Sequence, residues 1–188
     1  MFEIKTFLEK HSYDIADLSL FTRERYIGLE ESSKFKDYFA YRKFSPEYIQ
    51  MVVTIKYQNK TVIGIDEPDG LSLWEQTYST AIKQYLKNRQ AETMYGIDPV
   101  TLKWTSLGNG SLHFILVGEW DEYIFAEAVL PEKEFLEAML NEAEHFWQVL
   151  LEYKVFEGEN KRKDSPKDYP AQMIKEIKEL REKVKLLK

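Results

Sequence analysis

The chain has 188 residues, contains no cysteine and carries a formal net charge of −6. That length suits one domain, and a domain of this size buries about 70% of the surface that its unfolded chain exposes, so it needs no covalent cross-links. The absence of cysteine excludes a disulfide-stabilised fold, thiolate zinc sites, iron–sulfur clusters and cysteine nucleophiles.

The N-terminal 47 residues are the hardest part to assign. We predict a short helix over Phe2–Lys10 and a second within Ser32–Arg42, where Phe35, Tyr38 and Phe39 fall on one side. Residues 11–31 fit a strand or a loop equally well. The chain starts without the apolar run of a signal peptide, and no stretch reaches the ~20 apolar residues that span a bilayer. We therefore expect a cytoplasmic protein without membrane contact.

Strand patterns dominate the middle of the chain. Tyr48–Tyr57 alternates apolar and polar residues, and Gln58–Lys60 then turns the chain into a short partner strand, Thr61–Ile65. Two further strands, Leu102–Leu107 and Ser111–Val117, flank a glycine-rich hairpin turn, and Glu122–Leu130 supplies a fifth. The strands are therefore expected to form one antiparallel sheet of about five strands.

Two helices interrupt and follow these strands. Ser72 and Glu75 have the spacing of a capping box, which predicts a helix from Ser72 to about Gln90. A longer helix over Pro131–Glu152 carries apolar residues at spacings of three and four. Helices packed on one face of an antiparallel sheet make an α+β fold. A β-barrel is the alternative.

The composition changes after residue 156, which predicts a single α+β domain over residues 1–156. Residues 157–169 are charged and contain almost no large apolar side chain, as is typical of an exposed linker. Residues 170–188 then form an amphipathic helix, whose apolar positions are Met173, Ile177, Leu180, Val184 and Leu187. These positions continue for barely two heptads, so the helix docks on the parent domain or self-associates as a homodimer.

No catalytic, cofactor or metal motif is present. Glu142 and His145 share one helical face, but a di-iron site needs that motif twice, so we interpret them as a surface pair. His113 lies in an apolar strand, where a structural role is favoured over a catalytic one. We therefore predict a protein that is not an enzyme. The alternative is an enzyme of unrecognised type with a cleft near His113.

The acidic excess is confined to the middle of the chain. Residues 1–65 carry 10 basic and 9 acidic side chains, residues 66–156 carry 6 and 16, and residues 157–188 carry 10 and 7. An acidic surface repels phosphate backbones and attracts basic proteins, which argues against nucleic acid and favours a basic protein partner. The alternative is that these acids only maintain solubility. The candidate contact residues are Asp66, Glu67, Asp69, Trp120, Asp121 and Glu122.

Residues 110–150 run through two strands into a long helix, with the sequence GSLHFILVGEWDEYIFAEAVLPEKEFLEAMLNEAEHFWQVL. This stretch resembles the small acidic α+β immunity proteins of bacterial polymorphic-toxin systems. The resemblance implies a protein that binds a cognate toxin and blocks it, commonly with acidic side chains against a basic nuclease. Trp120 would add buried contact area to such an interface, or else it caps the edge of the sheet.

Overall fold

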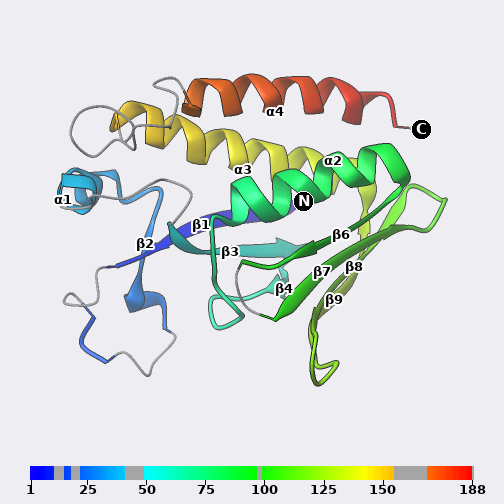
Figure 1. The fold of residues 1–188 in the computed structure, drawn as a ribbon, viewed down its shortest axis with the longest axis horizontal. Coiled ribbons are helices and arrows are strands. Elements are labelled where there is room, and N and C mark those ends of the chain that lie inside the picture. Colours follow the sequence, from blue (N-terminus) through cyan, green and yellow to red (C-terminus); the bar gives the residue numbers. More distant parts are fainter. Residues whose placement is uncertain (11–14, 18–21, 41–48, 97–98, 155–168, 188) are drawn as a thin grey trace.

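The computed structural model describes residues 1–10, 15–17, 22–40, 49–96, 99–154 and 169–187. The α+β class is confirmed, since helices pack against antiparallel strands (Figure 1). The strands are divided between two sheets, of five and four strands, where the sequence indicated a single sheet of about five. The predicted linker lies, apart from Tyr169, outside the described residues.

The first sheet, sheet A, has the order β2-β1-β3-β4, and β5 pairs with one end of β3. Its strands are β1 (Phe2–Glu9), β2 (Tyr26–Gly28), β3 (Gln50–Tyr57), β4 (Lys60–Ile63) and β5 (Gly70–Leu71). The helix predicted over Phe2–Lys10 is wrong, because this segment is β1 and pairs with β3 along its length. Thr6, Phe7 and Leu8 are all buried, so the alternation that marks a strand is lost here.

The second sheet, sheet B, follows chain order, so that each strand pairs with the next. Its strands are β6 (Gln90–Met94), β7 (Val100–Ser106), β8 (Ser111–Gly118) and β9 (Ile124–Pro131). The last three confirm strands predicted from the sequence, whereas β6 was not predicted. Gly108 and Gly110 both have positive φ in the β7–β8 hairpin, as the glycine-rich turn requires.

The helices are α1 (Phe35–Ala40), α2 (Ser79–Asn88), α3 (Glu132–Glu152) and α4 (Tyr169–Lys185), and short 3₁₀ turns cover Arg23–Arg25 and Ser32–Lys34. A π-helical turn over Leu73–Tyr78 precedes α2. The predicted capping box is wrong. Ser72 has a left-handed backbone and caps no N–H group with its side chain, and Glu75 instead accepts a hydrogen bond from Tyr169 on α4.

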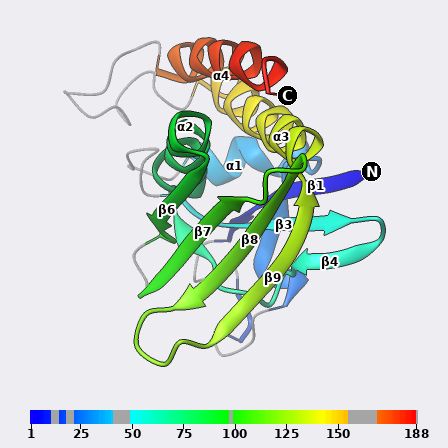
Figure 2. The same ribbon diagram turned by 90° about the vertical axis from the view of Figure 1, so that its right-hand side faces the viewer.

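The helices form layers over the inner faces of the two sheets (Figures 1 and 2). Helix α3 crosses both sheets: Phe135 contacts the ring of Phe2 on β1 and the rings of Trp104 and Phe114 in sheet B. Helix α4 lies on the side of α3 that faces away from the sheets. None of the described helices combines the length and apolar character that a membrane crossing requires.

The apolar face of α4 packs within the chain. Its four main apolar residues are at most 7% exposed, and they are Met173, Ile177, Leu180 and Val184. Leu187 packs partly buried against the same core. Self-association through this face would therefore require α4 to leave α3.

Candidate functional site

The first acidic segment, Asp66 to Asp69, connects β4 to β5. Burial raises the pKa of Glu67, and the neighbouring Asp66 carboxylate raises it further. Asp69 has a different role, because its carboxylate accepts a hydrogen bond from the Tyr26 hydroxyl at 3.2 Å. Asp69 therefore holds this loop against sheet A. The exposed Asp66 and the half-buried Glu67 are the members that a partner can reach.

The second acidic segment, residues 119–122, forms the turn between β8 and β9, which projects from the lower edge of Figure 1. The Asp121 carboxylate accepts the Tyr123 N–H at 3.1 Å, so Asp121 shapes the turn. Glu122 has a φ of 53°, a left-handed conformation that costs about 1–3 kcal/mol at a non-glycine residue. Trp120 is 86% exposed, which argues against a role in capping the sheet edge.

The fold brings the two acidic segments to the same end of the molecule. A Cβ atom on Gly96, just after β6, would lie 2.7 Å from the Cα atom of Gly70, which follows the first segment. The Glu119 N–H donates to the carbonyl of Pro99 at 2.8 Å, so the second segment borders the same β6–β7 connection. We call this region the acidic end, and it comprises Asp66, Glu67, Asp69, Glu119, Trp120, Asp121 and Glu122.

Three acidic residues of α3 are paired with arginines inside the fold. Arg89 forms an ion pair with Glu132, whose side chain is 2% exposed. Arg181 on α4 lies 3.4 Å from Glu137 and 2.9 Å from Glu144. Carboxylates that already have a basic partner attract a second one weakly. Glu132, Glu137 and Glu144 are therefore less available to a basic partner than the carboxylates of the acidic end.

His113 lies on the solvent-facing side of β8, while Leu112 and Phe114 on either side point into the core. Its Nε2 atom lies 2.7 Å from a carboxylate oxygen of Glu127 on β9. The His113 side chain is 30% exposed. This cross-strand pair lies on an open sheet surface, which does not enclose a substrate as a catalytic site would.

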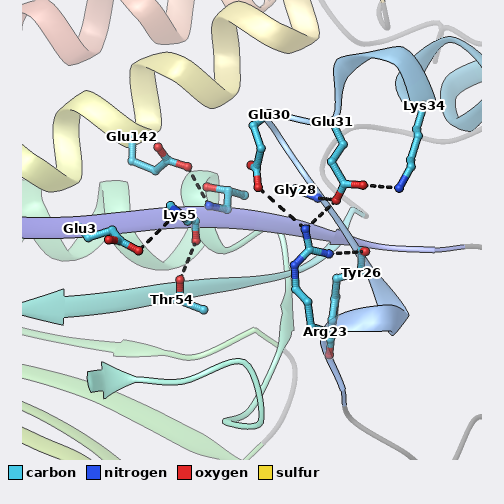
Figure 3. A network of polar contacts seen from close by, with 11 residues as sticks. Glu3, Lys5, Arg23, Tyr26, Gly28, Glu30, Glu31, Lys34, Thr54 and Glu142 are labelled. Carbon is cyan, nitrogen blue, oxygen red and sulfur yellow. Dashed lines mark hydrogen bonds and ion pairs between the residues drawn. The ribbon is translucent and has the colours of Figure 1, made fainter. Parts of the chain in front are cut away.

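Glu142 connects α3 to β1, as Figure 3 shows. Its carboxylate accepts the backbone N–H of Thr6 at 2.7 Å, while His145 lies 3.5 Å away on the exposed side. The Thr6 hydroxyl in turn accepts the indole N–H of Trp74 at 2.9 Å. The Glu142–His145 pair was interpreted as a surface pair, but Glu142 itself joins a helix to a strand.

Glu142 provides a test of this connection by pH. Burial raises the pKa of Glu142 in the folded state, against the opposing effect of the Thr6 hydrogen bond. The folded protein therefore binds the proton more tightly than the unfolded chain, and stability falls as the pH rises from about 4.5 through the folded-state pKa. We expect Glu142→Gln to reduce this decline in urea-unfolding free energy, to which Glu67 and Asp69 also contribute through their raised pKa values, whereas Glu134→Gln on the exposed side of α3 should leave the decline unchanged.

A further polar network, missed in the sequence, braces the outer face of sheet A (Figure 3). Arg23 donates to the Tyr26 carbonyl at 2.8 Å and to Glu31 at 2.6 Å, and its guanidinium lies 4.6 Å from the ring centre of Phe7. Hydrogen bonds from Lys34 and Arg23 lower the pKa of Glu31 to about 2. These contacts hold the chain over Phe7, so we assign the network a structural role.

Within the part of the chain that the structure describes, no group of three or more histidine, aspartate or glutamate side chains could hold a metal ion. Comparison with protein-family models, with curated proteins and with solved structures gives no match.

Proposed function

We propose that this chain is a non-enzymatic binding protein whose acidic end contacts a basic protein, in the manner of an immunity protein that neutralises a basic toxin. The observation that carries the proposal is the 86% exposure of Trp120 on the turn where Glu122 holds a left-handed backbone. Tryptophan is enriched among the residues that dominate protein interfaces, because its large ring buries much apolar area. A turn that keeps a strained backbone residue and exposes an indole to water is consistent with a role in binding another protein.

The charges around Trp120 support a basic partner. Asp66, Glu67 and Glu122 have no part in the hydrogen bonds that hold Asp69 and Asp121 in place. Such groups increase the rate of encounter with an oppositely charged protein, and salt screens the effect. The ring of Trp120 would then contribute most of the affinity, and the carboxylates the rate and the choice of partner.

Paired capture from the native host tests the proposal. Tagged wild-type protein should retain a basic protein in stoichiometric amount, and Trp120→Ala should weaken its affinity by about 2 kcal/mol or more, roughly 30-fold. The triple variant Asp66→Lys, Glu67→Lys, Glu122→Lys should slow association and reduce its salt dependence. Titration calorimetry and stopped-flow mixing with the purified partner measure the two effects.

The matched control reverses three exposed glutamates on α3 and α4, Glu134→Lys, Glu152→Lys and Glu179→Lys, with the same change in net charge. It should leave the association rate close to that of the wild type at physiological salt. Equal effects of the two triple variants would show that only net charge matters. An unchanged affinity of Trp120→Ala for the captured protein would rule out the proposed anchor.

A further inference from the structure

The outer face of sheet B continues the acidic end along the strands. The β-pairing places Met94, Thr101, Val117 and Ile124 side by side in the row nearest the Trp120 turn. The next row contains Glu92, Lys103, Ile115 and Glu127. Apolar side chains therefore lie on β8 and at both ends of the first row, and the two acidic side chains of the second row lie on the edge strands β6 and β9.

This face is hollowed beside the turn. A depression of about 560 Å³ has Ile115, Val117 and Ile124 among its lining residues, together with Glu119 and Glu122 from the turn. Lys103 also lines it, but its ammonium group lies 3.6 Å from Glu92, so a carboxylate already offsets its charge. The depression therefore combines an apolar floor with an acidic border.

The two sheets differ in how their outer faces are covered. On sheet A, Phe7 and Val52 are at most 7% exposed, in a cluster with Tyr26. On sheet B, Met94 is 61% exposed and Ile124 is 48% exposed. No described helix or strand lies over this face, which is turned toward the viewer in Figure 2. The fold thus covers one apolar sheet surface and leaves the other open beside its most exposed tryptophan.

The open face of sheet B is large enough to form a substantial part of a specific interface. Stable interfaces bury about 800 Å² on each partner. The seven residues of β7 extend about 24 Å, and four strands about 4.8 Å apart span roughly 19 Å, so the face offers on the order of 450 Å². The sheet face can therefore supply about half of the area that a stable interface needs on one partner, and the two acidic loops border it.

We propose that the outer face of sheet B is the docking surface for an extended basic segment of a protein partner. An apolar side chain of that segment rests on Ile115, Val117 and Ile124, and flanking lysine or arginine side chains meet Glu119 and Glu122. This inference rests on the proposed function and specifies the partner, since an acidic border around an apolar floor is complementary to alternating basic and apolar residues.

The test uses the peptide acetyl-Arg-Lys-Ile-Lys-Arg-amide, titrated into ¹⁵N-labelled full-length protein at low salt. We expect amide shifts along β7, β8 and the start of β9, together with a change in Trp120 fluorescence, because Trp74, Trp104 and Trp147 are at most 1% exposed. Replacing the peptide's isoleucine by serine should weaken binding at least fivefold. An all-glutamate version of the flanks should not bind.

Two variants on the same strand and the same face separate the depression from the rest of the sheet. Ile124→Lys should weaken peptide binding at least tenfold, and Val129→Lys, at a 58% exposed position in the row beyond the depression, should change it less than twofold. Ile124→Ser removes the apolar contact without adding charge and should also weaken binding. The amide spectrum of each variant verifies its fold.

Each outcome bears on one proposal or both. Shifts confined to residues 66–69 and 119–122, with full binding by Ile124→Lys and Ile124→Ser, would overturn the sheet-face inference and leave the acidic end as the contact. If Ile124→Lys and Val129→Lys weaken peptide binding equally and Ile124→Ser does not weaken it, the effect is due to charge alone. This outcome would also overturn the sheet-face inference. The absence of any shift would count against both proposals.

Discussion

Replacing Arg89 by alanine is expected to lower the free energy of unfolding by about 3 kcal/mol. The change leaves the Glu132 carboxylate, whose side chain is 2% exposed, without its basic partner. Removing one member of a buried ion pair typically costs about 3–5 kcal/mol, because the remaining charge is uncompensated. We expect the lower end of this range, since Glu132 begins α3 and the helix dipole favours a negative charge there.

Removing one member of this ion pair should lower the free energy of unfolding more than removing the other. The Arg89 side chain is 41% exposed, so in Glu132→Ala the guanidinium can turn toward water and avoid an uncompensated charge. Glu132→Ala should therefore be less harmful than Arg89→Ala. Adding Glu132→Gln to Arg89→Ala should recover part of the loss, because the amide replaces the buried charge by a neutral group.

Urea unfolding of the wild type, the two single variants and the double variant measures these differences at one pH. Lys87→Ala, an exposed residue near the end of α2, is the control and should lie within about 0.5 kcal/mol of the wild type. A smaller cost for Arg89→Ala than for Glu132→Ala would contradict the ion-pair explanation. Arg89 would then act mainly through its hydrogen bond to Ser106.

Periodicity predicted the elements that bury one face and expose the other. Helix α3 and strand β8 have that character along their length, and β3 and β7 have it in part; each was located from the spacing of its apolar residues. Strand β1 was not recognised from periodicity, because neighbouring residues are buried on opposite faces. Phe7 joins a second apolar cluster with Tyr26 and Val52, while Leu8 points into the main core. A strand covered on both faces loses the alternation that identifies it.

The division into two sheets could not be read from local pattern. Strand β1 pairs with β3 across more than forty intervening residues, and the pattern of a single strand does not specify its neighbours. The capping box failed for a similar reason. Ser72 donates its backbone N–H to the carbonyl of Ile49, just before β3, and its backbone is left-handed, whereas a helix N-cap residue is typically extended.

Local sequence pattern also could not show which acidic residues are available to a partner. The sequence indicated an acidic excess over residues 66–156 without showing which carboxylates are paired, because the cations that pair with α3 are distant in the chain. Arg181 reaches Glu137 and Glu144 from α4, and Arg89 reaches Glu132 from the end of α2. Only the fold distinguishes these carboxylates from those of the acidic end, and only the fold shows that the outer face of sheet B is open beside the β8–β9 turn.

Introducing a charge into the α3–α4 contact is expected to have the second large effect. Ile177 is 1% exposed, so Ile177→Asp places a carboxylate where burial excludes the water that would hydrate it. Ile177→Ala, which only leaves a cavity, should cost about 2–5 kcal/mol, and the aspartate should cost more. The ion pairs of Arg181 and of Lys83 with Glu176 lie at the rim of this contact and cannot hold α4 alone.

Unfolding experiments combined with light scattering distinguish docking from self-association. If α4 is docked on its own chain, Ile177→Asp should lower the free energy of unfolding and leave the oligomeric state unchanged. The adjacent exposed substitution Lys178→Asp should alter neither property. A wild-type dimer that Ile177→Asp dissociates at unchanged stability would show that α4 instead pairs with a second copy. Release of α4 would also expose the apolar surface of α3, so the docked arrangement predicts increased dye binding and aggregation of the Ile177→Asp variant.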